Sequence, residues 1–454
     1  MNQKKEPSAE EVLPAKRTVK KKGQRDLDLK DFPEEILPPY SVSEEQLDAF
    51  YGKNNWRRMP DETYKRLRHE PESWTVEIHT VEVYVGTDGD HQDEFLRGNR
   101  PRDLLRNSIV TPSLLASILN VKYVNSSALH RIEQEFQRNG VNISRQTMSN
   151  WIVKCSQMYF TPFVERMKQE LLSLHVTQSD ETPTQVIADS DHPNSKCYMW
   201  VHRSGEFYTR RPIVVYEYQK GRDHQKTLDF YKDYKGVLVT DSLHQYHLVD
   251  KKLPDVTNAN CWAHARRKFD EALQTLPKEM QKDSPAAIGE CYCSRLFKLE
   301  QAFAELTPEE RYEKRLKQEK PVLDALLSWA NEMQVKTAPK SALGRAIHYL
   351  LEQWPYLTRY LEDGRLELSN NRAERSIKPF VMGRKNWLFA NTAGGARASS
   401  LIYSLIETAK ENGLDPYRYL LWILRNAPQL SETDEAWAEK LLPARAPKEC
   451  YMPQ

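Results

Sequence analysis

The chain has 454 residues, of which 39% are hydrophobic and 29% are charged, and its formal net charge is +2. This length predicts roughly two to four folded units, and the composition excludes a largely disordered protein. No stretch approaches the roughly 18 consecutive apolar residues of a membrane span, and the Lys-rich start lacks the apolar core of a signal peptide, so we expect a cytoplasmic protein without membrane association.

The first 110 residues divide into a polar leader and a segment with β character. Residues 1–35 are rich in lysine and proline, which predicts a basic, mobile leader. Residues 36–110 include an alternating, β-branched stretch from Trp74 to Val85, which predicts a small β unit. The basic leader suits a phosphate backbone, although a merely solvated charge run explains it equally well.

Residues 111–170 change to a helical pattern. Thr111 and Ser144 stand where helix N-caps are expected. The helix that follows Ser144 carries Arg145 and Gln146 at its exposed start and is similar to the second half of a helix-turn-helix. We therefore predict that Arg145 and Gln146 contact DNA in a mainly helical N-terminal binding region. A plain helical hairpin with a polar outer face is the alternative.

Residues 171–262 alternate between strand-like and helical segments. One strand ends at Asp180, two more are joined through Gly205, a helix follows, and a buried apolar strand ends at Asp241. Three strands, a helix and a fourth strand, with acids ending the first and fourth, is the order of a ribonuclease H-like α/β core. The first acid is not unique, because Glu181 is adjacent and Asp189 and Asp191 lie near the same strand.

The remainder of the chain is dominated by helical patterns. Residues 263–366 are charge-rich and almost wholly helical, which predicts a large α-helical insertion in the core. Residues 367–428 would complete the core, and residues 429–454 form a tail. The stretch SNNRAERSIKP predicts a short helix capped by Ser369 or Asn370, limited by Pro379, with Glu374 on its polar face.

The three acids suggest phosphodiester chemistry. Two divalent ions about 4 Å apart can activate an attacking oxygen and stabilise a leaving one, and Mg²⁺ prefers a few carboxylates. We predict that Asp180, Asp241 and Glu374 bind Mg²⁺, with Mn²⁺ as a substitute. Neighbouring polar and basic side chains would orient the acid and contact DNA phosphates. They are Asn370, Asn371, Arg375, Lys378, Arg384 and Lys385.

The six cysteines are expected to be free thiols, because nothing in the sequence exports the chain. Cys261 and His264 form a C-x-x-H pair, but no second ligand pair follows at a suitable spacing. The spacing therefore does not favour a structural zinc site.

Four motifs in one order, SDETP, VTDSLHQY, CWAHARRKF and LSNNRAERSIKPFVMGRKNWLFANTAGGARAS, resemble the transposases of the insertion-sequence-66 family over roughly residues 95–428. The resemblance implies a DDE-type transposase in which Asp180, Asp241 and Glu374 are the catalytic acids. It also implies basic DNA contacts beside the site, at His264, Arg266 and Arg267. Members of the family often carry a cysteine-paired, zinc-knuckle-like segment before the helix-turn-helix region. The corresponding residues 48–71 of this chain contain no cysteine, so a role of such a zinc segment in recognising the DNA end is in doubt here.

We therefore expect a transposase that binds the terminal inverted repeats of its element, cleaves the ends by metal-dependent hydrolysis and joins the 3′-hydroxyl to target DNA. It would act as a homo-oligomer, at least a dimer on DNA, and the resemblance implies small companion proteins. Two alternatives stay open. One is a structure-selective nuclease with the same fold, and the other is a domesticated, inactive transposase that only binds DNA.

Overall fold

The computed structural model describes residues 102–189, 196–208 and 211–453, together with Glu45, Trp74, Val76, Val83–Val85 and Phe95–Arg97. The chain divides into two compact units, Met1–Gly98 and Asn99–Gln454. In the first unit, strand β1 (Val83–Val85) pairs antiparallel with β2 (Phe95–Arg97). The basic leader, the cysteine-free stretch and most of the β segment predicted before Val83 lie outside the described residues.

The second unit begins with a group of helices. They are α3 (Pro112–Leu119), the π-helical turn η1 (Asn120–Val124), α4 (Leu129–Arg138), α5 (Arg145–Cys155), the π-helical turn η2 (Ser156–Phe160) and α6 (Thr161–Leu172). The hydroxyl of Thr111 accepts a hydrogen bond from the Leu114 N–H at 3.2 Å, and that of Ser144 from the Thr147 N–H at 3.1 Å. Both predicted N-caps are therefore confirmed.

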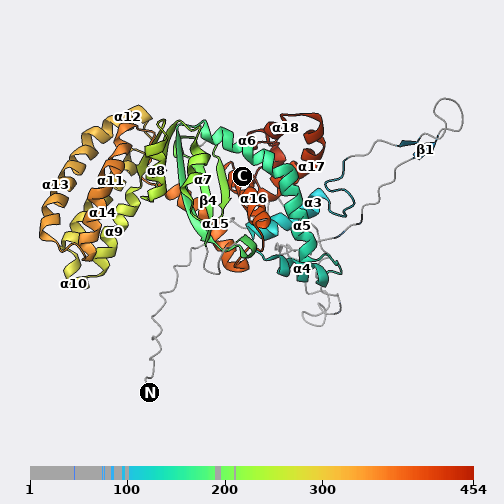
Figure 1. Cartoon of the computed structure of the whole chain (residues 1–454), viewed down its shortest axis with the longest axis horizontal. Coiled ribbons are helices and arrows are strands. Elements are labelled where there is room, and N and C mark those ends of the chain that lie inside the picture. The colour runs from blue at the N-terminus through green and yellow to red at the C-terminus, as the bar shows by residue number, and fades with distance from the viewer. Residues whose placement is uncertain are drawn as a thin grey trace, which may run out of the picture. The chain divides into compact units, whose positions relative to one another are not determined.

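A five-stranded mixed sheet lies at the centre of this unit (Figure 1). Its order is β5-β4-β3-β6-β7, with β4 antiparallel to β3 and β5, and with β6 and β7 parallel to β3. The strands are β3 (Val176–Thr184), β4 (Cys197–Ser204), β5 (Val214–Gln219), β6 (Gly236–Thr240) and β7 (Val256–Asn260). The four predicted strands are present, but the first does not end at Asp180. Strand β3 continues through Pro183 to Thr184, because its antiparallel pairing with β4 extends that far. The sequence does not predict β7, because Thr257, Asn258 and Asn260 make it too polar to read as a buried strand.

Helices cover both faces of the sheet. Helices α7 (His224–Tyr231) and α8 (His244–Lys252) lie on one face, where the Tyr246 hydroxyl donates to Ser179 Oγ at 3.1 Å. On the other face, α15 (Asn371–Trp387) packs against β3, and the Ala373 N–H donates to Gln178 Oε1 at 3.2 Å. Successive residues of β3 thus face different helices, as the alternation of a strand requires.

The C-terminal helices protect the outer edge of β5. They are α16 (Ala393–Glu411), α17 (Pro416–Thr433) and α18 (Trp437–Lys440). The Thr408 hydroxyl accepts from the Val214 N–H at 3.0 Å, and the Ser404 hydroxyl accepts from the Tyr216 N–H at 2.7 Å. These hydroxyls satisfy backbone groups that an open edge strand would expose to unwanted pairing. Short 3₁₀ turns complete the unit at Ile187–Asp189, Glu206–Tyr208, Pro443–Arg445 and Lys448–Cys450.

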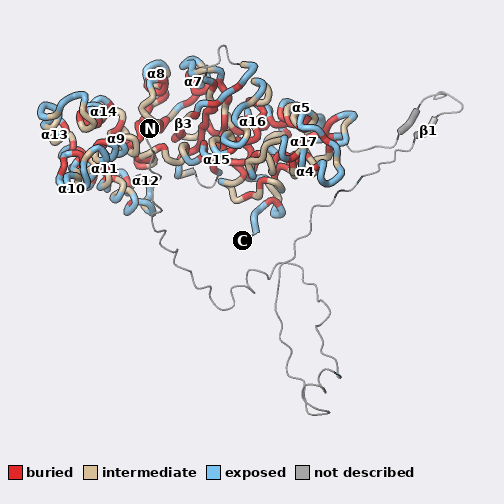
Figure 2. The backbone as a smooth tube through the Cα atoms, turned by 90° about the horizontal axis from the view of Figure 1, so that it is seen from below, coloured by how far each residue is buried: buried red, intermediate tan, exposed pale blue. Residues whose placement is uncertain are grey.

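The chain between β7 and α15 is helical and stands beside the sheet (Figure 1). It comprises α9 (Trp262–Gln274), α10 (Lys278–Gln281), α11 (Pro285–Ala302), α12 (Pro308–Lys314), the π-helical turn η5 (Arg315–Glu319), α13 (Lys320–Lys336), α14 (Ala342–Leu357) and the 3₁₀ turn η6 (Thr358–Glu362). Its apolar core, which includes Trp262 and Phe269, is continuous with Val237 and Val239 of β6. Figure 2 shows the buried backbone running through the sheet and these helices. The helical segment is therefore packed onto the sheet and not tethered loosely to it.

Helix α15 is longer than the sequence predicts. Pro379 does not limit it, because the helix continues through this residue to Trp387. A proline inside a helix removes one backbone hydrogen bond. The inner face of α15 is nevertheless buried against the rest of the unit, through Ala373, Ile377 and Phe380. Packing of that face outweighs the local cost. Among the described helices, none combines the length and hydropathy needed to cross a lipid bilayer.

Candidate active site

The three predicted acids come from three elements that meet at one edge of the sheet. Asp180 belongs to β3, Asp241 directly follows β6, and Glu374 lies in the first turn of α15. Parallel pairing of Gln178 with Val239 brings Asp180, two residues further along β3, level with Asp241, two residues beyond Val239. All three acidic side chains are only partly buried, so the edge they share is open to solvent and to a ligand.

Electrostatic coupling among the acids reflects how close they are. Burial raises the pKa of Asp180 well above its usual range, and the neighbouring carboxylates of Glu181, Asp241 and Glu374 raise it further. Burial also raises the pKa of Asp241, although the Leu243 N–H, which donates to its Oδ1 at 3.1 Å, acts in the opposite direction. The cluster thus resists carrying its full negative charge unless a cation is nearby.

Glu181, the acid next to Asp180, is directed to the opposite face of β3. The Tyr246 hydroxyl of α8 donates to Glu181 Oε2 at 3.1 Å, and Arg222 forms an ion pair with Oε1. Asp180 lies on the side of β3 that faces α15, where Glu374 is found. The alternation of the strand therefore favours Asp180 over Glu181 as the partner of Glu374.

Asp189 is also engaged away from the cluster. Its Oδ2 accepts a hydrogen bond from the Tyr218 hydroxyl at 2.7 Å, and its Oδ1 lies 3.9 Å from the amine of Lys220. Asp191 lies outside the described residues. Of the alternatives that the sequence leaves open, Asp180 is the acid that the described geometry favours.

The start of α9 brings two of the predicted DNA contacts to Glu374. His264 Nε2 lies 3.6 Å from Glu374 Oε1, and a terminal nitrogen of Arg267 lies 3.6 Å from Oε2. Burial lowers the pKa of His264, while the charges of Glu374 and Asp241 oppose that shift. A histidine and an arginine beside the acids can contact a DNA phosphate, and the histidine can also carry a proton.

Cys261 completes a second grouping around Glu374. Its sulfur, a His264 ring nitrogen and a Glu374 oxygen all lie within 4.8 Å of one another, the one such set of three among the described residues. The sequence does not reveal it, because Glu374 is distant along the chain from the C-x-x-H pair. Burial raises the pKa of the Cys261 thiol to about 12. A protonated thiol is a poor ligand for Mg²⁺, which prefers oxygen.

Asn370 differs from its predicted role. Its side chain is fully buried, and its Nδ2 donates to the Ser179 carbonyl of β3 at 3.3 Å. Its own carbonyl accepts from the Glu374 N–H at 3.1 Å. The burial of Asn370 argues against the direct DNA contact predicted from the sequence. Asn370 immediately precedes α15, and its side chain is directed toward β3 and not toward solvent. Asn370 instead ties the helix that carries Glu374 to the strand that carries Asp180.

A second buried link, which the sequence does not predict, involves Gln178 and Glu367. Gln178 Oε1 accepts from the Ala373 N–H, while its Nε2 donates to Glu367. The other Glu367 oxygen accepts from the Glu206 N–H at 3.1 Å. Gln178 precedes Asp180 by two residues, so the two side chains lie on the same face of β3. The alternation of the strand could therefore have indicated from the sequence that Gln178 lies near the site. No sequence signal identifies Glu367.

Glu367 makes the stability of this link depend on pH. Burial raises the pKa of this carboxyl from 4.5 to about 7. The contribution of Glu367 to the free energy of unfolding is complete below the pKa that the group has in the unfolded chain. It is lost as the pH rises through about 7, because folding then buries a charged carboxylate. The pKa shift corresponds to roughly 3 kcal/mol. We expect Glu367→Gln to unfold at a higher temperature than the wild type at pH 8 and not at pH 5. The exposed Glu362→Gln is the control, and equal shifts at both pH values would contradict the assignment.

The other predicted DNA contacts differ in exposure. Asn371 is half-buried, whereas Arg375, Lys378 and Lys385 are exposed on α15. Arg384 donates to the Thr182 hydroxyl of β3 at 3.2 Å, two residues beyond Asp180. These side chains form a basic border along the face of α15 that begins at Glu374.

The remaining predicted contacts lie elsewhere. Arg266 is directed toward the helical segment, because its guanidinium is 3.9 Å from Glu290 and lies over the Phe297 ring. Arg145 and Gln146 are exposed at the start of α5, where Gln146 donates to an asparagine in the next turn. The described residues bring neither of them to the acids.

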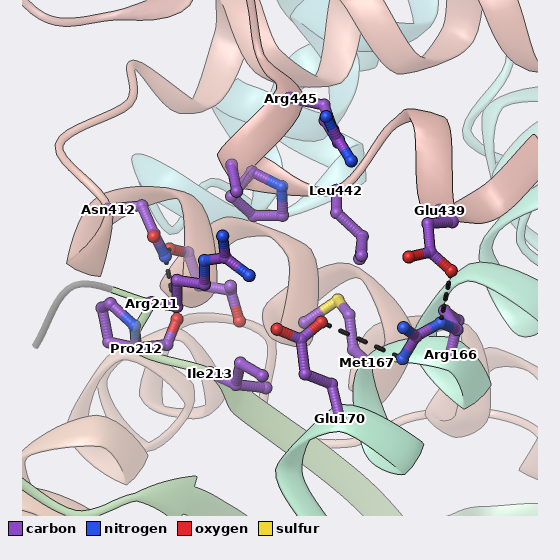
Figure 3. A pocket seen from close by; sticks show the side chains of 13 residues that line it. Arg166, Met167, Glu170, Arg211, Pro212, Ile213, Asn412, Glu439, Leu442 and Arg445 are labelled. Carbon is purple, nitrogen blue, oxygen red and sulfur yellow. Dashed lines mark hydrogen bonds and ion pairs between the residues drawn. The ribbon is translucent and has the colours of Figure 1, made fainter. Parts of the chain in front are cut away.

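A pocket among the described residues lies away from this edge (Figure 3). It has a volume of about 330 Å³ and is lined where β5 begins, next to Ile213, by α6 and the C-terminal segment. Arg166 is paired there with Glu439 at 3.2 Å and with Glu170 at 3.9 Å (Figure 3). None of the three acids is among the residues that line this pocket. The candidate site is therefore an open edge and not this pocket.

The donor set at the acid edge fits a hard divalent cation. Among the described residues, Glu374 Oε1 is a buried oxygen without a hydrogen-bond partner. Burial raises the pKa values of both Asp180 and Asp241, and a bound cation would offset the negative charge that burial disfavours. Carboxylate oxygens from Asp180, Asp241 and Glu374 are the ligands that Mg²⁺ prefers.

Comparisons with known proteins indicate the family of this chain. Residues 107–398, more than half of the chain, match the transposase IS66 family, and residues 404–444 match the IS66 C-terminal element. The first match includes all three acids.

The chain is also similar to uncharacterized proteins of Sinorhizobium fredii. Protein y4qI is 30% identical over 351 residues, covering 74% of this chain and 63% of that protein. Protein y4hP is 26% identical over 326 residues, covering 69% of this chain and 59% of that protein. The chain thus spans less than two thirds of the length of these two relatives. With the two family matches covering most of residues 107–444, the chain belongs to the IS66 family of transposases.

Proposed function

We propose that this chain is a DDE transposase that binds the terminal inverted repeats of its element, cleaves the ends by metal-dependent hydrolysis and joins the 3′-hydroxyl to target DNA. The observation that carries the proposal is the meeting of Asp180, Asp241 and Glu374 at one open sheet edge. The strand order and the antiparallel β4 support a ribonuclease H-like core. The helices from α9 to η6 correspond to an insertion in that core.

Each acid has a role in the proposed chemistry. Asp180 and Asp241 would hold one Mg²⁺ jointly, and Glu374 would hold a second. When bound, the ions supply charge that activates the attacking oxygen and stabilises the leaving oxygen. The protein itself holds the acids in register through Asn370 and Gln178, so that little reorganisation is needed when DNA binds.

The basic residues would hold the DNA. Arg267 and His264 lie close enough to Glu374 to contact the phosphate being cleaved. Arg375, Lys378, Arg384 and Lys385 follow the same helix and would contact flanking phosphates. End recognition would use α5, whose exposed start carries Arg145 and Gln146. Holding two transposon ends together implies at least a dimer on DNA. Small companion proteins of the same element would be further partners.

Two rivals predict different products. A duplex carrying the inverted repeat that flanks the gene, incubated with full-length protein and Mg²⁺ or Mn²⁺, should be nicked at the repeat end. A structure-selective nuclease would prefer branched junctions over this end and would not join DNA. An inactive, domesticated protein would bind the end duplex without cutting it, and that result would overturn the proposed enzymatic activity.

Magnesium binding should itself depend on pH. The raised pKa values of Asp180 and Asp241 mean that the cluster retains protons, which must leave before a cation binds. Because these protons leave more readily at pH 8, we expect Mg²⁺ to raise the unfolding temperature more at pH 8 than at pH 6. A ligand present at about 100 times its Kd stabilises the folded protein by about 2.7 kcal/mol. Glu374→Gln should remove the part of this rise that the second ion contributes. An equal rise in that variant would exclude Glu374 as a ligand.

A further inference from the structure

An exposed apolar turn lies beyond the acids, at the end of α15. Leu388 is 65% exposed, Phe389 is 41% exposed and Met382, on the last turns of the helix, is 57% exposed. Ile187, which begins the 3₁₀ turn after β3, is 52% exposed and lies next to this turn, because its N–H donates to the Ala390 carbonyl at 3.0 Å. These large apolar side chains are therefore exposed to solvent together, whereas such side chains are usually buried.

The backbone of this turn is strained. Leu388 has φ 67° and ψ −50°, and the Phe389 N–H donates to the Trp387 carbonyl across it at 2.8 Å. This is a γ-turn with positive φ, a conformation that a bulky side chain rarely adopts. Such strain persists where the surroundings enforce it, and it is concentrated at functional sites. A glycine at this position would remove the strain, but it would also remove the exposed side chain.

The turn has a rigid base. The ring of Trp387 covers Gly383 so closely that a Cβ there would collide with it. The Lys122 amine lies 4.3 Å from the centre of that ring, and Tyr123 packs edge-on at 6.2 Å between centroids. Asn386 donates to the Ser126 carbonyl at 2.9 Å, which ties the same helix end to the start of the α4 region. The exposed side chains therefore project from a fixed platform.

The turn is also aligned with the acid edge. The Ala390 N–H donates to the Gln185 carbonyl at 3.0 Å, so the turn lies beside the chain that continues β3 beyond Asp180. Five residues of extended chain separate Asp180 from Gln185, which is roughly 16 Å. Arg384 and Lys385 lie between Glu374 and the turn along α15. A duplex whose phosphate lay at the acids would reach this turn within a few base steps.

We propose that Leu388 and Phe389 form an apolar wedge that enters the base stack of the DNA end held at the acids and unstacks one base step. The inference rests on the proposed function and extends it to distortion of the DNA. The patch consists of four exposed apolar side chains beside Arg384 and Lys385, whereas a stable protein interface uses about 20–30 residues on each partner. Apolar side chains flanked by basic ones are what proteins insert between base steps to kink a duplex.

The test uses the end duplex with 2-aminopurine placed singly at positions near the cleavage site, and full-length protein without metal. The wild type should raise the fluorescence at one position, because 2-aminopurine brightens when it is unstacked. In the double variant Leu388→Ala/Phe389→Ala the rise should be lost, and with Mg²⁺ cleavage should fall by roughly tenfold or more, since unstacking a step costs a few kcal/mol. Val335→Ala, which alters a side chain 89% exposed on α13, is the matched control and should change neither signal.

Rescue distinguishes a wedge from a structural role. An abasic site or mismatch at the responding position removes most of the unstacking cost, so it should restore cleavage by the double variant. Leu388→Gly should lose the fluorescence signal while unfolding at a temperature equal to or above that of the wild type, because the positive φ suits glycine. Unchanged fluorescence and cleavage in the double variant, or cleavage that the abasic site fails to rescue, would overturn the wedge alone. Absence of cleavage by the wild type would instead overturn the proposed function.

Discussion

Asp241→Asn is expected to abolish end cleavage and strand transfer while leaving binding of the end duplex nearly unchanged. Asparagine keeps an oxygen that can accept the Leu243 N–H, so the local turn after β6 survives. What is lost is one negative charge from the proposed metal site. Metal ions contribute several kcal/mol of transition-state stabilisation, so the cleavage rate should fall on the order of a thousandfold.

The control for this variant is Asp189→Asn. Asp189 lies near the same strand but bonds to Tyr218 away from the cluster, so its variant should cleave at close to the wild-type rate. Cleavage by both proteins should be followed on one labelled end duplex, with binding measured by gel shift in the absence of metal. Substantial cleavage by Asp241→Asn, or loss of cleavage by Asp189→Asn instead, would remove Asp241 from the proposed triad.

Arg315→Met is expected to be among the most destabilising single changes in the helical segment. The Arg315 side chain is fully buried in η5, and all five of its N–H groups are used. Two donate to the Glu300 carboxylate at 2.7 Å each, and three donate to the carbonyls of Tyr360, Asp363 and Leu366 at 2.7–3.0 Å. Methionine would leave the acid and the three carbonyls without these partners.

Removing one partner of a buried ion pair costs roughly 3–5 kcal/mol. Glu319 adds to the effect, because burial and Glu300 already raise its pKa to about 8 and Arg315 opposes that rise. The unfolding temperature should fall on the order of 10 °C in a thermal melt. Arg295→Met, at an exposed position of α11, should shift it by less than about 2 °C. A fall no larger than that of the control would mean that the burial of Arg315 contributes little.

Much of the core could be predicted from local patterns. The caps at Thr111 and Ser144 are chemical signals that act within one helical turn. The alternating strand before Asp180 and the apolar strand before Asp241 can also be recognised in the sequence. Strand β7 could not be predicted, because its asparagines are buried by partners distant along the chain. Asn260, for example, donates to Gln353 of α14 at 2.9 Å. Pro379 misled the helix prediction because tertiary packing outweighed its local preference.

The site was predicted less evenly. The strand ends, the polar helix face and the resemblance all indicated the three acids, but only the sheet face could separate Asp180 from Glu181, since both are acidic and adjacent. The polar face of α15 correctly suggested a functional helix, yet it could not indicate that Asn370 turns inward. Glu367 gave no signal, because a buried carboxylate is recognisable only when its partners are in view.

Strand transfer from a pre-cut end is the most direct test of the central claim. A duplex carrying the flanking inverted repeat with an exposed 3′-hydroxyl should be incubated with full-length protein, Mg²⁺ and a supercoiled target plasmid. We predict joined products that require Mg²⁺ and that disappear with Asp241→Asn. Efficient binding and cleavage of the end without any joined product would contradict the assignment of this chain as an active transposase.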